Sequence, residues 1–204
     1  AAGNMDKRIV FNWLKKQMAT PDIPKVFHNA MYDLGWLRAE GIEVQGKIID
    51  TMIAAPLVDE NRRFYNLNSL AKDYLNESKS EKILRAAAAE FGVDPKSEMY
   101  KLPSRYVGAY AEQDAAVTLR LYDHLSIKLE KEECTSIFEL ESELLPVIFE
   151  MKTRGVRVDI DKAEQVKKIM AKEEKKLLQE ISKDTGVMIE PWVATSIAKT
   201  FDFL

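Results

Sequence analysis

The sequence has almost no cysteine, and this scarcity excludes two kinds of structure. Its 204 residues include a single cysteine, Cys134, which cannot close a disulfide within the chain. Neither a Cys-x-x-Cys pair nor a cluster of cysteine and histidine is present, so a zinc site built from these residues is excluded as well. Any metal ion that the chain binds must be held by carboxylates, and oxygen ligands of this kind suit Mg²⁺ or Mn²⁺.

Long apolar segments are also missing. No hydrophobic run approaches the roughly 18 residues that a membrane-spanning helix requires, and the N-terminal segment lacks the charged-then-apolar pattern of a signal peptide. Hydrophobic residues make up 46% of the chain and charged residues 31%, which is typical of a folded chain. We therefore expect a soluble intracellular protein of one or two packed domains, with no membrane partner.

An excess of basic residues is absent too. The formal net charge is −3, from 30 Lys and Arg against 33 Asp and Glu, which is not the basic footprint of a duplex-binding domain. A site that gathers carboxylates around metal ions is itself acidic, however, and the bound ions reverse its charge. The net charge is therefore a weak argument against a nucleic-acid ligand.

The most regular pattern that is present lies in residues 104–125. Apolar residues recur there at intervals near 3.6 and predict a long amphipathic helix. Tyr110 and Asp114 are one turn apart on this helix, about 6 Å from each other, so the phenol and the carboxylate can act on one bound group. Positions 110 and 118 carry no Lys or Arg that could pair with Asp114. The alternative interpretation is an ordinary solvated aspartate.

A second pattern begins at residue 25. Residues 25–28 predict a short buried strand and residues 30–37 a helix, so Asn29 lies where the strand passes into the helix. Asp33 falls in the first turns of that helix. Ligands of open α/β sheets bind beyond the carboxyl ends of the strands, so Asn29 and Asp33 are placed for chemistry. The alternative is that the helix dipole alone favours an acid at Asp33.

Further elements complete the expected α/β class. A second strand is predicted at residues 47–49, parallel to the first. Asp50 at its end could be a third metal ligand, but the helical sequence that follows favours a helix cap. Arg62 and Arg63 lie in a loop before a helix at residues 67–75, where they either reach a phosphate or form a solvated pair in a polar turn.

The C-terminal part predicts two more long helices. We expect a domain boundary after residue 130, in a highly charged helical segment. The next helix covers residues 137–151, and its expected buried side consists of Leu140, Leu144, Leu145, Val147, Ile148 and Met151. A last helix at residues 162–184 is rich in Lys and Glu, which indicates either a solvated face or a row of lysines that faces DNA.

The two site patterns together resemble the proofreading 3′-5′ exonuclease domain of the DNA polymerase I family, family A, of the DEDDy type. The second motif of that family is Asn, three residues, then Asp, as Asn29 and Asp33 stand here. The third motif is Tyr, three residues, then Asp, as Tyr110 and Asp114 stand here. Both motifs are short, but they occur in the order that the family shows.

Segments outside the motifs are similar to the family as well. KIIDTM at residues 47–52 and LNSLAKDYL at residues 67–75 resemble its connecting segments. Residues 141–159 resemble the entry into its polymerase domain. The resemblance therefore covers nearly the whole chain.

The resemblance implies a ribonuclease H-like (DnaQ-like) α/β fold and phosphodiester hydrolysis with two Mg²⁺ or Mn²⁺ ions. Asp33 and Asp114 would be metal ligands, Tyr110 would orient the attacking water, and Asn29 would help to place the strand end. DNA is the implied partner, as a single-stranded 3′ end at this site and as a primer-template for the parent polymerase. The parent enzyme would act in DNA replication and repair, as a monomer in the cytoplasm of a bacterial or phage-infected cell.

One motif of the family is missing. Its first motif, an Asp-x-Glu pair that shares a metal with the later aspartate, does not occur before Asn29. We therefore expect a fragment that begins inside the exonuclease domain: residues 1–130 as a partial, mostly helical exonuclease domain, and residues 131–204 as the first palm or thumb-base helices of the polymerase domain. Such a fragment is expected to bind metal weakly and to be inactive alone. Two other hypotheses remain open: an inactive module that binds single-stranded DNA, and a structural helical adaptor.

Overall fold

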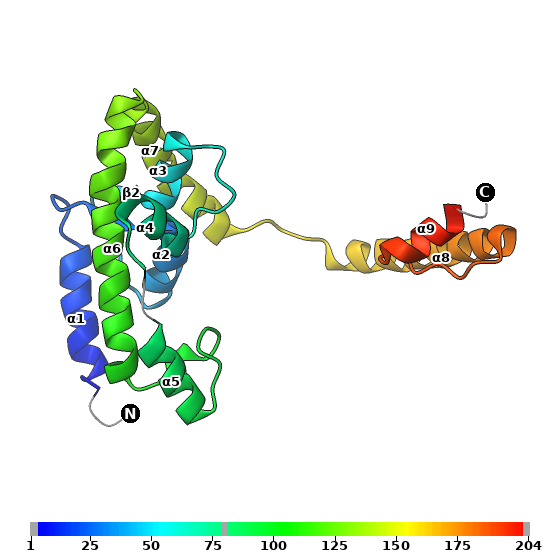
Figure 1. The fold of residues 1–204 in the computed structure, drawn as a ribbon, viewed down its shortest axis with the longest axis horizontal. Coiled ribbons are helices and arrows are strands. Elements are labelled where there is room, and N and C mark those ends of the chain that lie inside the picture. Colours follow the sequence, from blue (N-terminus) through cyan, green and yellow to red (C-terminus); the bar gives the residue numbers. More distant parts are fainter. Residues whose placement is uncertain (1–3, 79–80, 202–204) are drawn as a thin grey trace. The chain divides into compact units, whose positions relative to one another are not determined.

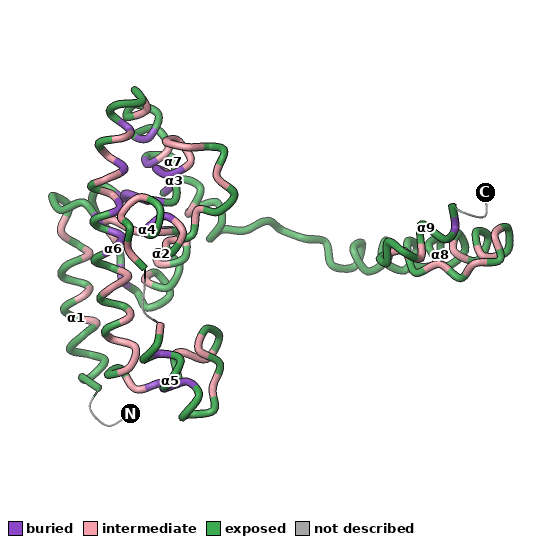
Figure 2. The backbone as a smooth tube through the Cα atoms, in the orientation of Figure 1, coloured by how far each residue is buried: buried purple, intermediate pink, exposed green. Residues whose placement is uncertain are grey.

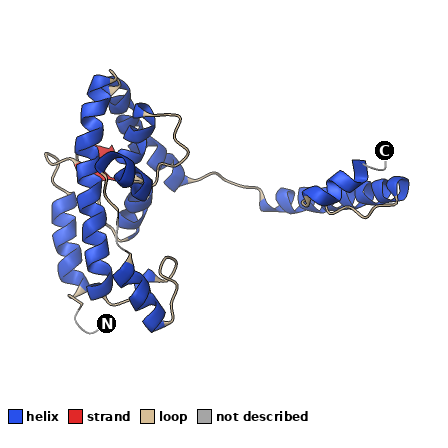
Figure 3. Ribbon diagram, in the orientation of Figure 1, coloured by secondary structure: helices blue, strands red, loops and turns tan. Residues whose placement is uncertain are grey.

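A computed structural model describes residues 4–78 and 81–201 (Figure 1). The chain forms two compact units, Ala1–Arg154 and Gly155–Leu204. Helices predominate in both, and the described ranges contain one pair of short strands (Figure 3). The predicted domain boundary after residue 130 stays a prediction, because a compact unit and an inherited domain need not end at the same residue. No helix within the described ranges is long and apolar enough to cross a membrane.

The first unit alternates helices and strands at its start and is helical afterwards. In chain order its elements are α1 (Lys7–Met18), β1 (Lys25–Phe27), α2 (Ala30–Ala39), β2 (Ile48–Asp50), α3 (Thr51–Val58), α4 (Leu67–Leu75), α5 (Lys82–Phe91), the 3-10 turn η1 (Met99–Lys101), α6 (Ser104–Lys131) and α7 (Thr135–Arg154). The strands and helices that the sequence predicts here are confirmed, with ends that shift by a few residues.

The two strands form a parallel sheet, as expected from the sequence. The register pairs Phe27 at the end of β1 with Asp50 at the end of β2. Because the strands are parallel, their carboxyl ends lie at one edge of the sheet. Helices α2 and α3 both begin at this edge, so the turns that follow the two strands meet there.

Two contacts fix the loops that precede the strands. The buried Lys25 ammonium donates hydrogen bonds to the carbonyl of Thr20 and, at 2.7 Å, to that of Gln45. Gly46 has a φ of +86°, and a Cβ atom at this position would lie 2.3 Å from the carbonyl oxygen of Pro21. The two loops therefore approach so closely that only glycine fits at position 46.

The C-terminal half of α6 supplies much of the hydrophobic core. Val117, Leu121, Leu125 and Leu129 follow one another at intervals of four residues and are at most 1% exposed. Such spacing puts them on one face of the helix, which packs against α3, α4 and β1. Figure 2 shows this concentration of buried positions along α6. The other half, towards Ser104, extends beyond this core and carries the predicted site residues of the helix.

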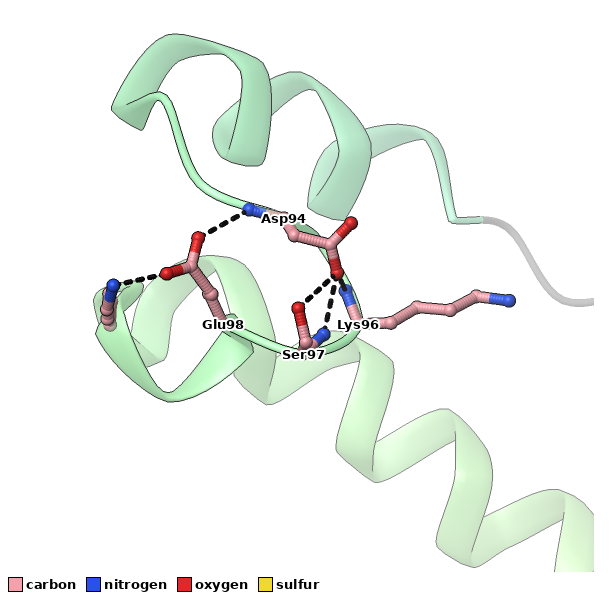
Figure 4. A network of polar contacts seen from close by, with 5 residues as sticks. Asp94, Lys96, Ser97 and Glu98 are labelled. Carbon is pink, nitrogen blue, oxygen red and sulfur yellow. Dashed lines mark hydrogen bonds and ion pairs between the residues drawn. The ribbon is translucent and has the colours of Figure 1, made fainter. Parts of the chain in front are cut away.

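The half of α6 that carries Tyr110 packs against α5. A small cluster of Leu84, Ala87, Ala88 and Leu102 is covered there by Tyr106, Val107 and Tyr110. A hydrogen-bonded turn joins the two helices (Figure 4). The Asp94 carboxylate accepts bonds from the backbone N–H of Lys96 at 2.9 Å and from the N–H and hydroxyl of Ser97 at 2.7 and 2.8 Å, while Glu98 accepts the Asp94 N–H at 3.0 Å.

Helix α7 corrects one expectation. Leu145 is buried as predicted, but the other five residues of the expected buried side are 42–66% exposed: Leu140, Leu144, Val147, Ile148 and Met151. The helix instead packs through a face that contains Phe138, Ser142 and Leu145, against α2, α3, α6 and β2. The apolar spacing correctly predicts the helix, but most of the side that it marks as buried is exposed.

The second unit contains α8 (Ile160–Thr185) and α9 (Ala194–Phe201). Asp159 caps α8 by accepting the Lys162 N–H at 3.0 Å, and the helix has no buried residue. Two of its lysines lie close to glutamates of the same helix: Lys167 lies 3.7 Å from Glu164, and Lys176 lies 3.9 Å from Glu173 and 3.8 Å from Glu180. The two interpretations of this charged face, a solvated face and a row of lysines that faces DNA, both stay predictions.

Candidate functional site

The first pair of predicted site residues lies in the turn after β1. Asn29 precedes α2 and has a φ of +69° and a ψ of 56°, the left-handed conformation that asparagine tolerates better than most residues. Its side chain is exposed and makes no capping bond to the helix. Asp33 stands one turn further, in the first turn of α2, and is partly buried.

Burial is the main influence on Asp33. It raises the pKa of this carboxyl above the usual value, the carboxyl's bond to its own backbone opposes this increase, and the charge of Asp50 adds to it. Asp33 and Asp50 are therefore close enough to interact. Two neighbouring acids, one of them with a raised pKa, are a common feature of sites that use carboxylates chemically.

Asp50 itself is a cap. Its carboxylate, 4% exposed, accepts the Met52 N–H of α3 at 2.8 Å, which confirms the capping interpretation. The same carboxylate also accepts the N–H groups of Asn29 at 2.9 Å and Ala30 at 2.7 Å, at the start of α2. Both oxygens are engaged with the backbone, so the interpretation of Asp50 as a third metal ligand is not supported.

The second pair of predicted residues lies on α6. Burial raises the pKa of the Tyr110 phenol first, and the charge of Asp114 and a hydrogen bond with it raise the pKa further. Tyr110 and Asp114 therefore share a helical face and interact with each other, and their action on one bound group stays a prediction. Asp114 is partly buried, and its carbonyl accepts the Thr118 hydroxyl at 2.8 Å, a bond within the helix.

The two pairs belong to neighbouring elements, because α6 packs beside β1 and Asn29 follows β1 closely. Across residues 4–78 and 81–201, however, no group of three or more His, Cys, Asp or Glu side chains is arranged to hold a metal ion. The carboxylates of Asp33 and Asp114 are the right donors for Mg²⁺ or Mn²⁺, but they are fewer than a complete site needs. The predicted roles of the two residues as metal ligands stay predictions.

The two arginines differ from each other. Arg62 bonds to Asp73 at 2.5 Å, its guanidinium lies 5.1 Å from the centre of the Tyr74 ring, and only 16% of its side chain is exposed. Arg63 is exposed and lies over the ring of Phe64, 5.3 Å from its centre. The expectation of a solvated pair is therefore wrong for Arg62. Contact of either residue with a phosphate stays a prediction, and no pattern in the sequence predicts the bond between Arg62 and Asp73, which is eleven residues away.

The fold and the positions of these residues together define a class of protein. A parallel pair of strands followed at one edge by helices, with acidic residues in the turn and a tyrosine–aspartate pair on a long neighbouring helix, is the arrangement expected of a ribonuclease H-like exonuclease. A sequence-family model described as 3′-5′ exonuclease matches residues 2–130, and the chain belongs to this family, the exonuclease region of family A DNA polymerases.

Relatives and solved structures agree with this membership. The chain is 30% identical to a DNA-directed DNA polymerase of Pseudomonas phage M6 over 207 residues, which cover 99% of the chain and 31% of the relative. It is 28% identical to DNA polymerase I of Treponema pallidum over 160 residues, 77% of the chain and 15% of the relative. The chain thus spans about a third or less of the curated relatives it matches.

Two solved structures are similar in fold. The POL domain of Pol1 from M. smegmatis, in complex with DNA primer-template and dNTP, has a TM-score of 0.64 and 25% identity, over 98% of this chain and 30% of that one. Brucella melitensis NrnC has a TM-score of 0.56 and 25% identity, over 71% of this chain and 66% of that one. These likenesses confirm the predicted ribonuclease H-like (DnaQ-like) fold class, mostly helical with a small parallel sheet.

Proposed function

We propose that the chain is part of a DNA polymerase I-type enzyme, in which its site removes nucleotides from the 3′ end of DNA during proofreading. Family membership supports this proposal, and so do relatives whose names are those of DNA polymerases. The observation that carries it is the Tyr110–Asp114 pair, which interacts on α6 at the positions of the family's third motif.

The raised pKa of Tyr110 defines what this side chain does at neutral pH. Its phenol remains protonated and therefore does not act as a base; the hydrogen bond with Asp114 uses its one proton, and its oxygen can accept a hydrogen bond from a water molecule. Asn29, exposed beyond the carboxyl end of β1, offers an amide that can both donate to and accept from a strand end. Tyr110 would orient the attacking water, and Asn29 would help to place the strand end.

Asp33 and Asp114 would hold Mg²⁺ or Mn²⁺. Such ions, when bound, polarise a water molecule and stabilise charge on the leaving 3′ oxygen. Because the described residues do not assemble a complete ligand set, we assign to this chain the binding and orientation of the strand end and no hydrolytic step. Residues 131–204 are, in this proposal, the start of the polymerase domain.

The test is a degradation assay on the complete polymerase that contains this chain. A 5′-labelled single-stranded oligonucleotide is incubated with Mn²⁺, and the shortening of its 3′ end is followed on a gel. We expect Asp114→Ala to abolish shortening and Tyr110→Phe to slow it, while both variants extend a primer normally. Shortening that persists in Asp114→Ala at the wild-type rate would refute the proposed site.

A second candidate concerns the isolated chain. Because the described ranges hold no three-ligand group and the sequence has no Asp-x-Glu pair, the 204-residue chain alone would bind a single-stranded 3′ end without cutting it. Binding of a labelled oligonucleotide without its degradation would support this candidate.

A further inference from the structure

A set of hydrogen bonds joins the ends of the two strands. Two successive residues, Asp50 at the end of β2 and Thr51 at the start of α3, bond to all four residues of the turn from the end of β1 into α2, residues 27–30. We call this set the strand-end clamp. It joins two segments that are about twenty residues apart in the sequence, at the edge of the sheet where Asn29 lies.

Thr51 forms one side of the clamp. Its fully buried hydroxyl donates to the carbonyl of Phe27 at 3.1 Å and lies 2.8 Å from Nδ1 of His28. Since the hydroxyl proton is used on Phe27, the ring nitrogen of His28 is the donor in the second bond. The end of β1 is thus fastened through both its backbone and the His28 side chain.

Asp50 forms the other side. One carboxylate oxygen accepts the N–H groups of Asn29 and Met52, and the other accepts the N–H of Ala30. A single buried charge therefore caps α2 and α3 together, and hydrogen bonds to an ionised acceptor are stronger than those between neutral groups. Asn29 does not cap α2 with its own side chain.

The conformation of Asn29 explains why this cap comes from another strand. A residue in the left-handed region turns successive N–H groups towards one point, which creates a cradle for an anion. At the start of a helix such a cradle often binds a phosphate. Here the Asp50 carboxylate fills it, so the phosphates of a bound strand are excluded from this backbone and must be recognised by side chains.

We propose that Asp50 is a positioning residue for the strand-end site: it holds the turn at Asn29 in the left-handed conformation and so fixes where the side chains of Asn29 and Asp33 lie. The left-handed region is less favourable than the right-handed one even for asparagine, although asparagine tolerates it better than most residues. Without the carboxylate the turn therefore relaxes, and both side chains move relative to α6. For its ligand this inference rests on the proposed function, but the clamp can be tested without any ligand.

The first experiment examines the clamp in the wild-type chain. Scalar coupling across hydrogen bonds, measured by NMR, should link the amides of Asn29 and Ala30 to the Asp50 carboxyl carbon. In Asp50→Asn, hydrogen exchange of these two amides should become at least tenfold faster. Asp6→Asn is the matched control, because Asp6 caps α1 through the Arg8 N–H at 2.8 Å. It should leave exchange at Asn29 and Ala30 unchanged.

The second experiment separates positioning from general stability. Binding of a 5′-fluorescein ten-nucleotide single-stranded DNA is measured by anisotropy, at a temperature where circular dichroism shows every variant folded. We expect Asp50→Asn to weaken binding at least tenfold and Asp6→Asn to change it less than twofold. If Asp50→Asn does not fold, Asp50→Glu replaces it, since it retains the charge but displaces the oxygens.

Several outcomes would overturn the proposal. They are the absence of coupling in the wild type, unchanged exchange in a folded Asp50 variant, and unchanged affinity in a folded variant whose exchange is faster. If the wild-type chain does not bind the oligonucleotide at all, strand-end binding by this chain fails, while coupling and exchange still decide whether Asp50 fixes the turn.

Discussion

Tyr110 and Asp114 act on each other across one turn of α6, because the carboxylate raises the pKa of the phenol through its charge and a hydrogen bond. Replacement of Asp114 by Asn should lower the pKa of Tyr110 but leave it above the ordinary value of 10.0, since burial is the larger cause. NMR titration of chains with labelled tyrosine rings measures this, and Tyr110→Phe identifies the signal. An unchanged titration would show that the pair is not coupled.

The same shift has a consequence for stability at high pH. The pKa of Tyr110 is higher in the folded chain than in the unfolded chain. Its contribution to the free energy of unfolding is therefore fully present below the unfolded-state pKa and is lost as the pH rises through the folded-state pKa. Wild-type chain should therefore lose more stability than Tyr110→Phe above about pH 10. Urea unfolding at a series of pH values provides the comparison.

Metal binding should be weak. We predict that the carboxylates of Asp33 and Asp114 lie within about 8 Å, a span that two clustered ions can bridge. With two carboxylates, the affinity for Mn²⁺ should be millimolar, because affinity depends on the number of charged ligands. Titration calorimetry measures it, and Asp33→Asn and Asp114→Asn should each reduce it. A micromolar site, or a separation of 15 Å or more, would contradict this assignment.

The pKa of Asp33 gives this binding a pH dependence. Because burial raises this pKa, a proton displaces the metal at a higher pH than it would from an ordinary aspartate, whose value is 3.8. Affinity should fall as the pH decreases through the raised value, and Asp33→Asn should remove this component. If the affinity for Mn²⁺ stays constant until the pH falls to the ordinary aspartate value of 3.8, the raised pKa of Asp33 would be contradicted.

The isolated 204-residue chain should show no measurable exonuclease activity. In the family the Asp-x-Glu pair shares the metal that activates water, and this sequence lacks the pair before Asn29. Loss of nucleophile activation and of charge stabilisation, each several kcal/mol, should cost on the order of 10⁴-fold or more in rate. A labelled oligonucleotide with Mn²⁺ is the substrate, and a complete DNA polymerase I is the positive control. Activity that Asp114→Ala removes would refute this prediction.

Two glycine substitutions should have opposite effects on stability. Gly46→Ala places a methyl group 2.3 Å from the Pro21 carbonyl at a positive φ, so it should destabilise the chain by at least about 2 kcal/mol. Gly35→Ala, within α2 and with nothing within 4 Å, should stabilise it by up to about 1 kcal/mol. Urea unfolding of both variants measures the difference. Equal effects would show that the two loops are not in close contact.

Helix α7 offers a matched pair of neighbouring leucines. Leu145 is 3% exposed and Leu144 is 42% exposed. Leu145→Ala should cost about 2–5 kcal/mol of unfolding free energy, and Leu144→Ala less than about 1 kcal/mol. The reverse order would mean that α7 packs through the side that carries Leu144.

The sequence predicted the elements well because their signals are local. Helix α4 has the predicted bounds, residues 67–75, and Asp50 is the predicted cap of α3. The spacing of Tyr110 and Asp114 depends only on helix geometry, so it too could be predicted. Resemblance to the exonuclease family then supplied the fold class, which two strands and several helices alone could not define.

The features that the sequence did not predict depend on contacts between segments that are distant along the chain. The bond between Arg62 and Asp73 and the cap that Asp50 provides for α2 join residues whose spacing has no periodic signal. In α7, apolar spacing shows that a face favours burial but cannot show where a packing partner stands. The roles of Asn29, Asp33, Tyr110 and Asp114 at a strand end stay predictions, because they concern a ligand.

The continuity of α6 constrains how the chain can vary. Its four buried apolar residues from Val117 onwards hold one end in the core, and Tyr110 and Asp114 precede them on the same uninterrupted helix. Deletion of one residue between Asp114 and Val117 would rotate the pair by about 100° around the helix axis and shift it by about 1.5 Å. A substitution elsewhere on α6 leaves the position of Tyr110 and Asp114 along the helix unchanged, whereas insertion or deletion of a single residue does not.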